Sequence, residues 1–215
     1  MNNNTIITKI ELQDPRNKSY ALYSEDVFLV EITEDTLVHF AISRGSEFSK
    51  KEFETIIDHD KVNLCLRQSY NYLQRRPHLQ KELERKLKQK GFPLHIIERA
   101  FLHLRKNKYI NDDDFICMFI RDILRQGKSG PLLIKKKLAE KGALFNKIDL
   151  HLDELFPIEK QKEIALRLLN GKHSKLNEQN KMKHKQKLLQ YGMGRGFSWV
   201  VLEPIINRLV SDEDY

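Results

Sequence analysis

The chain has 215 residues, of which 38 are lysine or arginine and 30 are acidic, for a formal net charge of +8. This length allows one large domain or two small ones, and it can bury a core without disulfides. The longest apolar runs, at residues 115–120 and 200–202, are much shorter than the about 18 residues that a membrane span needs. A transmembrane protein is therefore excluded.

Two further features concern the compartment. Residues 1–5 are rich in asparagine and lack the basic and apolar regions of a signal peptide, so we expect the protein to stay in the cytosol. Cys65 and Cys117 are 52 positions apart, and the chain has no CxxC motif. Neither a disulfide framework nor a cysteine-based zinc site is expected from this spacing.

The net charge is distributed unevenly along the chain. Residues 1–60 hold 6 basic and 12 acidic side chains, for −6, whereas residues 61–108 hold 13 basic and 3 acidic ones, for +10. Residues 109–155 are balanced, and residues 156–215 carry +4. An acidic N-terminal part thus precedes a basic part, which is the better candidate for contact with a polyanion or an acidic protein surface.

The N-terminal segment favours strands. Ile6, Ile10 and Leu12 share one face at period two, and residues 14–17 have turn-forming composition. Residues 19–23 and 27–32 are rich in aromatic and β-branched side chains and are joined by a short connection. We predict a three-stranded antiparallel meander.

Short helices follow the meander. Thr33 before two acids has the character of a helix N-cap, and Ser49 with Glu52 forms a capping box that opens a helix through Ile57. From about residue 61, helical periodicity replaces the strand signal. Three apolar stripes follow: Val62, Leu66, Tyr70 and Leu73; Leu79, Leu83 and Leu87; Ile97, Phe101 and Leu104.

A spacing of four residues recurs along the helical part. Leu83, Leu87 and Gly91 match Ile134, Leu138 and Gly142, and a fainter copy fits Leu188, Gly192 and Gly196. In each copy an apolar residue returns six positions after the last glycine, at Ile97, Ile148 and Leu202. The interval from Leu83 to Ile134, and that from Ile134 to Leu188, lies in the range of known helical repeats. Repeats of this kind usually stack on one another.

The predicted fold is therefore mainly α, with three tandem three-helix repeats in an extended or curved array after a small N-terminal module with a β-meander. The expected parts are the N-terminal module at 1–60 and the repeats at 61–108, 109–156 and 157–215.

Several motifs that resemble chemical sites have simpler interpretations. Residues 112–114 are three aspartates without the glycine or ligand spacing of a calcium loop, so we interpret them as helix-start acids. Residues 192–196 are glycine-rich, but no strand precedes them and no Lys-Ser/Thr pair follows, which favours a helix terminus over a phosphate loop. No HxxxH motif with an interposed acid, and no Ser/His/Asp or Cys/His arrangement, is apparent in the sequence. We expect no enzymatic activity, cofactor or metal.

The basic helices are the informative feature. Along residues 79–90 the leucines repeat at i, i+4, i+8, while Lys81, Arg85 and Lys88 form a stripe on the outward face. Cations near phosphates give salt-sensitive affinity without sequence specificity. A solvated helical surface is the alternative interpretation, and no recognition helix marks a helix-turn-helix protein. The candidate contact residues are Arg75, Arg76, Lys81, Arg85, Lys88, Lys135, Lys136, Lys137, Lys183, Lys185, Lys187 and Arg195.

A set of motifs resembles the bacterial RecX family along nearly the whole chain. The similarity is carried by Arg75, Arg76, Pro77, Lys81, Glu82, Leu83, Lys86, Leu87, Lys90, Gly91 and Phe92; by Leu104 and residues 109–115; by residues 127–131 with Ile134, Leu138, Lys141 and Gly142; and by residues 195–198. Residues 28–30 and 34–40 resemble the N-terminal extension of family members from low-GC Gram-positive bacteria.

The resemblance implies tandem three-helix repeats and a regulator that inhibits RecA by binding in the groove of its filament on single-stranded DNA. It thereby implies roles in recombination, DNA repair and the SOS response. The expected partners are the RecA nucleoprotein filament and, without sequence preference, single-stranded DNA; we expect a monomer and no membrane contact. The alternative is a basic nucleic-acid-binding protein that acts independently of RecA.

Overall fold

The computed structural model describes residues 4–16 and 18–211, within which the chain forms five strands and ten α-helices. It divides into two compact units, Met1–Arg76 with Leu83–Tyr109, and Pro77–Glu82 with Ile110–Tyr215. The predicted class, mainly helical after a small antiparallel β-meander, is confirmed. No helix in residues 4–16 and 18–211 combines the length and apolar character that crossing a bilayer requires.

The predicted meander is present. Its three strands are antiparallel in the order β2-β3-β4, namely β2 (Lys9–Asp14), β3 (Ser19–Ser24) and β4 (Val27–Thr33). Glu25 and Asp26 both have positive φ, 48° and 66°, as expected for a tight two-residue hairpin turn. The predicted turn before β3 includes Asn17, which lies outside the described residues.

The first strand differs from the prediction. A single strand with Ile6, Ile10 and Leu12 on one face was expected, but Ile6 and Leu12 are about half exposed and Ile7 is fully buried. The segment is divided, because β1 (Thr5–Ile6) pairs with β5 (Glu47–Phe48) and only the part from Lys9 joins the meander. The break between β1 and β2 changes the alternation, so Ile7 enters the core in place of Ile6.

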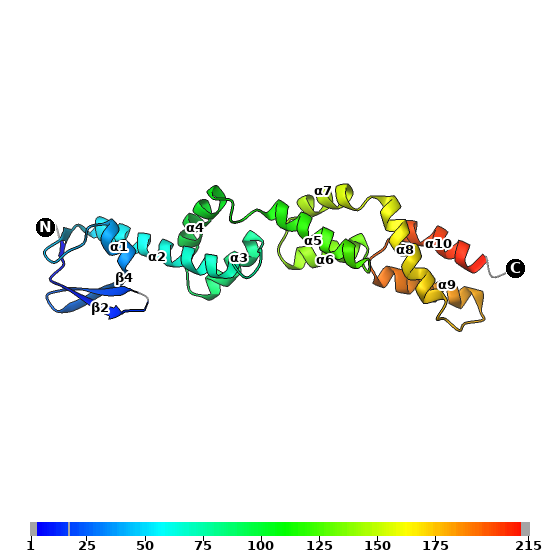
Figure 1. The fold of residues 1–215 in the computed structure, drawn as a ribbon, viewed down its shortest axis with the longest axis horizontal. Coiled ribbons are helices and arrows are strands. Elements are labelled where there is room, and N and C mark those ends of the chain that lie inside the picture. The colour runs from blue at the N-terminus through cyan, green and yellow to red at the C-terminus, as the bar shows by residue number, and fades with distance from the viewer. Residues whose placement is uncertain (1–3, 17, 212–215) are drawn as a thin grey trace. The chain divides into compact units, whose positions relative to one another are not determined.

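Two helices pack on the meander: α1 (Glu34–His39) and α2 (Lys50–Leu73) (Figure 1). The predicted capping box is formed, since the Ser49 hydroxyl accepts from the Glu52 amide and the Glu52 carboxylate accepts from the Ser49 amide. Two separate helices had been expected on either side of residue 60. This was wrong, because residues 58–61 contain no glycine or proline and continue the helix.

A buried carboxylate joins α2 to the end of the meander. Asp60 is 3% exposed, and its Oδ1 accepts hydrogen bonds from the Thr33 amide at 2.8 Å, the Thr33 hydroxyl at 2.7 Å and the Thr36 hydroxyl at 2.7 Å. Thr33 is at the predicted N-cap of α1, but its side chain serves Asp60 rather than the helix. The apolar core beside it contains Ile7, Leu22, Ile32, Ile42 and Ile56.

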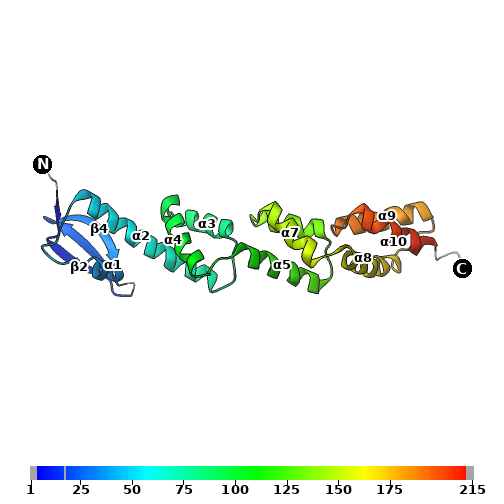
Figure 2. The same ribbon diagram turned by 90° about the horizontal axis from the view of Figure 1, so that it is seen from above.

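The helices after α2 are α3 (Gln80–Gln89), α4 (Leu94–Lys106), α5 (Asp112–Gln126), α6 (Pro131–Glu140), α7 (Phe145–Leu155), α8 (Ile158–His173), α9 (Lys181–Gly194) and α10 (Trp199–Ser211). Together with α2 they form three consecutive sets: α2 to α4, α5 to α7 and α8 to α10. In the first set α4 packs along α2, and the helices of the second and of the third set contact one another, with α8, α9 and α10 side by side (Figure 2).

The same turn follows the second helix of every set. Gly91, Gly142 and Gly196 have φ values of +88°, +96° and +88°. In each case the glycine amide donates to the carbonyl three residues back, and the next amide donates to the carbonyl five residues before it, as in Phe92 to Leu87 at 3.2 Å. This is the Schellman motif, in which glycine adopts the left-handed conformation without a Cβ penalty. The motif supports the sequence alignment of the three copies, including the faint third one.

The buried stripes also agree with the sequence for most helices. Leu83, Leu87, Ile134, Leu138 and Leu188 are fully buried. The third copy lacks a leucine at Gly192, and Leu202 occupies that space: a Cβ built on Gly192 would lie 2.5 Å from Leu202 Cδ2.

Two stripe details differ from the prediction. On α2, Cys65 and Ser69 are buried, whereas the predicted Val62, Leu66, Tyr70 and Leu73 are partly buried, because α2 packs on more than one neighbour. Leu79 belongs to the buried cluster of the second unit with Ile116 and Ile120.

Replacing Asp60 with alanine should lower the free energy of unfolding by about 3 kcal/mol, because three buried donors lose their acceptor. Asp58→Ala is the matched control on the same helix. Asp58 is 38% exposed and pairs with Arg99 at 3.3 Å, so its loss should cost less than about 1 kcal/mol. Urea unfolding followed by circular dichroism measures both, and equal effects would contradict the buried role of Asp60.

A pair of identical substitutions tests the turn glycines. A Cβ on either Gly91 or Gly171 meets no atom within 4 Å, but only Gly91 has a positive φ. Gly91→Ala should destabilise the protein by about 1–2 kcal/mol, and Gly171→Ala, inside α8, should stabilise it by about 0.5–1 kcal/mol. The two variants should shift the urea midpoint in opposite directions. Shifts of the same sign would refute the left-handed backbone conformation of Gly91.

Candidate nucleic-acid interface

The predicted basic groups occupy equivalent helices. They lie on α3, α6 and α9, each the second helix of its set, with further arginines beside helix ends. On α3, Lys81, Arg85 and Lys88 are exposed at the spacing of one helix face. Lys88 pairs with Glu84 at 2.5 Å, whereas neither Lys81 nor Arg85 forms an ion pair with a described residue. This stripe therefore has the predicted exposure, with one of its cations partly neutralised.

Arg75 and Arg76 follow the end of α2 directly. Both side chains are exposed. The Arg75 amide donates to the Tyr72 carbonyl at 3.2 Å, which continues the last turn of the helix. The ring of Tyr72 also receives Lys86 of α3, whose Nζ lies 5.1 Å from the ring centre. Arg75 is thus anchored by its backbone amide, and the side chains of both arginines are exposed.

The lysines of α6 differ from one another. Lys135 Nζ is 2.6 Å from Asp149 Oδ1 and 5.4 Å from the ring centre of Phe145, so this cation serves the contact between α6 and α7. Lys136 and Lys137 are exposed and form no ion pair with any described residue. Only these two of the three predicted lysines remain open to a partner.

The basic residues of α9 are likewise divided. Lys187 pairs with Glu178 at 2.6 Å, and its hydrogen bond lowers the pKa of that carboxyl. Lys185 donates to Asn207 at 3.0 Å, and Lys183 is exposed. Arg195 lies over the ring of Tyr191, 5.2 Å from its centre. Lys185, Lys187 and Arg195 are therefore held by neighbouring side chains, whereas Lys183 extends into solvent.

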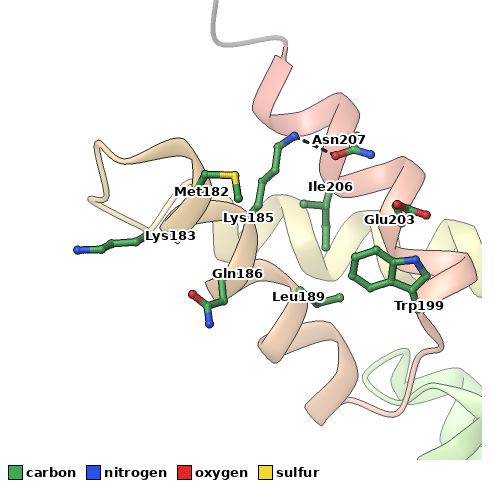
Figure 3. Close-up of a pocket in the computed structure, with 9 residues that line it drawn as sticks. All are labelled: Met182, Lys183, Lys185, Gln186, Leu189, Trp199, Glu203, Ile206 and Asn207. Carbon is green, nitrogen blue, oxygen red and sulfur yellow. Dashed lines mark hydrogen bonds between the residues drawn. The ribbon is translucent and has the colours of Figure 1, made fainter.

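A groove between α9 and α10 adjoins these lysines (Figure 3). It has a volume of about 380 Å³, and its apolar residues include Met182, Leu189, Trp199 and Ile206. Charge counting did not reveal it, because the two helices approach each other only in the fold. The sequence feature that indicates this groove is Trp199, the only tryptophan in the chain, which stands at the start of α10.

The acidic run at the start of α5 has the predicted structural use. Asn111 caps the helix by accepting from the Asp113 amide at 3.1 Å, Asp112 accepts from the Gln80 amide at 2.8 Å, and Asp114 accepts from the side chain of Asn111. No group of three or more metal-ligating side chains occurs among the residues that the structure describes. The glycine-rich segment at 192–196 is the end of α9 and its turn, as expected.

One constellation was missed. Cys117 Sγ lies 3.3 Å from His151 Nδ1, and His151 Nε2 lies 3.1 Å from Asp113 Oδ1, so a Cys–His–Asp chain joins α5 to α7. The sequence showed no such arrangement, because its members are 34 and 38 positions apart. Burial raises the pKa of the Cys117 thiol, and nearby carboxylates raise it further, although Arg121 opposes them. A neutral thiol at pH 7 is a poor nucleophile, so this geometry alone supports no covalent catalysis.

Several known proteins to which this chain is similar share one name, RecX. The family model described as RecX, first three-helix domain, matches residues 65–104. Proteins named regulatory protein RecX align over most of the chain: 27% identity over all of this chain and all of the Clostridium acetobutylicum protein, and 29% over 97% of this chain and 78% of the Streptococcus sanguinis protein.

Solved structures agree. The crystal structure of a regulatory protein RecX superposes with a TM-score of 0.76 at 25% identity, covering 94% of this chain and 100% of the other. RecX from Lactobacillus salivarius has the same fold, with a TM-score of 0.66 at 24% identity, covering 70% of this chain and 97% of the other. The predicted resemblance to the RecX family is confirmed by the family model, the aligned relatives and the structural match together.

Proposed function

We propose that this protein is a non-enzymatic regulator that inhibits RecA by binding in the groove of the RecA filament on single-stranded DNA. In this way it would limit recombination, DNA repair and the SOS response. It would act in the cytoplasm, as a monomer and without a cofactor. The proposed contact residues are the twelve cations of the sequence analysis, with the greatest weight on those that the fold leaves open.

One observation carries the proposal. The second helix of each three-helix set presents exposed cations: Lys81 and Arg85 on α3, Lys136 and Lys137 on α6, and Lys183 on α9. A filament repeats its subunits and its phosphates at regular intervals, so a repeat protein with equivalent basic helices can make many similar contacts. Linked weak contacts raise the overall affinity well above that of any one contact.

The central test is co-sedimentation with RecA filaments assembled on single-stranded DNA with ATP. The proposal requires the protein to pellet with filaments, and to remain in the supernatant when RecA is omitted at physiological salt. Failure to pellet with filaments would remove the proposal.

Reversing the charge of Lys81, Arg85 and Lys88 together should weaken inhibition of the RecA ATPase. Loss of three of several phosphate or carboxylate contacts at about 0.5–1 kcal/mol each predicts an inhibitory concentration higher by about 10-fold or more. Titration of RecA ATP hydrolysis with the wild type and the triple variant measures this shift.

The matched control reverses the same number of charges elsewhere. Lys50, Lys51 and Lys61 are exposed on α2 and form no ion pair with a described residue. Their triple glutamate variant should inhibit RecA like the wild type, with both variants retaining the helical circular dichroism spectrum. Equal loss in the two variants would show an effect of net charge alone, and unchanged inhibition in the α3 variant would refute that contact site.

The alternative, a nucleic-acid-binding protein independent of RecA, predicts a different result. It requires tight binding to single-stranded DNA near physiological salt without RecA. Filter binding across a salt series decides between the two, because affinity from phosphate contacts alone falls steeply as salt rises.

A further inference from the structure

The groove between α9 and α10 exposes two large apolar side chains. Met182 is 78% exposed and Trp199 is 50% exposed, whereas Ile206 on its floor is 4% exposed. Met182 and Trp199 lie at opposite ends of the groove, with Leu189 and Ile206 between them (Figure 3). Met182 and Leu189 are seven positions apart on α9, which corresponds to about 10 Å along the helix axis.

Neither exposed side chain is needed for the core of the third set. That core already contains Leu188, Val201, Leu202 and Ile205, which are nearly or fully buried. The indole N–H of Trp199 donates no hydrogen bond to any described residue. A tryptophan with an exposed π-face and a free polar edge is typical of a binding surface, because one part suits apolar contact and the other suits a hydrogen bond.

The charge around the groove favours an anionic ligand. Lys185 stands on its rim and donates one of its three protons to Asn207 at 3.0 Å, which leaves two for a ligand. Lys183 also lines the groove and extends outward into solvent (Figure 3). The single lining acid, Glu203, is four positions after Trp199 on α10 and is exposed, without an ion pair to a described residue.

We propose that this groove binds unstacked bases of a single-stranded nucleic acid, with one base stacked on Trp199 and the adjacent phosphates contacting Lys185 and Lys183. The inference rests on the DNA contact of the proposed function and assigns it a site. A nucleotide joins a flat π-face to a negative charge, which matches an indole beside lysines. An acidic peptide would match the lysines but would place its carboxylates against Glu203.

Glu203 gives the site a base preference. Its position one turn after Trp199 keeps phosphates away from that end of the groove and offers a carboxylate to the edge of the stacked base. Cytosine presents an amino donor that a carboxylate accepts, whereas thymine presents none at that position. We expect oligo(dC) to bind about threefold more tightly than oligo(dT), the ratio that one modest hydrogen bond gives.

The first measurement uses the single tryptophan of the chain as the probe. Titration with oligo(dC) or oligo(dT) of about eight nucleotides, at low salt and pH 8, should produce a saturable decrease in the tryptophan emission, because the base stacks on the indole. Binding detected by anisotropy of a labelled oligonucleotide without any change in tryptophan emission would overturn the proposal.

Variants locate the site. Trp199→Ala should weaken oligonucleotide binding by about tenfold, since stacking contributes about 1–3 kcal/mol per base. Val200→Ala is the matched control: Val200 is the next residue of α10, 73% exposed and outside the groove lining, and its loss should change affinity by less than about twofold. Glu203→Leu should remove most of the preference for oligo(dC), because leucine has no hydrogen-bond acceptor. Equal affinities of the two alanine variants would contradict the site.

Co-sedimentation separates this inference from the proposed function. If the wild type fails to pellet with RecA filaments but Trp199→Ala still loses oligonucleotide binding, the proposed function fails and the nucleotide site stands. If Trp199→Ala reduces pelleting with filaments but leaves oligonucleotide binding unchanged, the nucleotide site is wrong and the groove contacts protein instead.

Discussion

The turn between the second and third helices of each set is the constraint on which the helical part depends. A glycine at a φ near +90° lets the chain reverse while two backbone hydrogen bonds close the end of the helix. The third helix then packs back onto its set and buries Ile97, Ile148 or Leu202. Because the same hydrogen bonds recur at Gly91, Gly142 and Gly196, one local solution is used three times with different side chains around it.

The third set shows how the packing adapts to a changed sequence. Glycine replaces the central apolar residue at position 192, and the space is filled by the side chain of Leu202 from α10. The backbone of the turn at Gly196 also accepts two hydrogen bonds from the start of α6. The Gly130 amide donates to the Arg195 carbonyl at 2.7 Å, and the Leu132 amide donates to the Gly196 carbonyl at 3.0 Å. A glycine at 130 is required there, because a Cβ would lie 2.4 Å from the Gly196 carbonyl oxygen. The second and third sets are thereby joined by backbone atoms as well as by apolar side chains.

Some of the predicted contact lysines are paired with carboxylates, and others form no ion pair with a described residue. Lys135 and Lys187 each lie 2.6 Å from a carboxylate and stabilise contacts within their own sets. Lys136, Lys137 and Lys183 have no such partner among the described residues and retain their full charge for a polyanion. A count of basic residues therefore overstates the number of cations without an ion-pair partner. In the third set, Lys183 and Lys185 line a groove that also contains the Trp199 indole and the Met182 thioether, so this surface is apolar as well as basic.

Local sequence determined much of this protein. Interactions between near neighbours in the sequence determine four features that the structure confirms. These are the apolar residues spaced by four, the glycines after the second helices, the capping box at Ser49 and the meander with its tight hairpin. The family resemblance also came from the sequence, because it rests on the same residues. Tertiary structure decided the entry of Ile7 in place of Ile6, the Cys117–His151–Asp113 chain and the groove around Trp199. These features depend on atoms brought together from distant positions, and the pairing of a lysine or the exposure of an indole follows from what the fold places beside it.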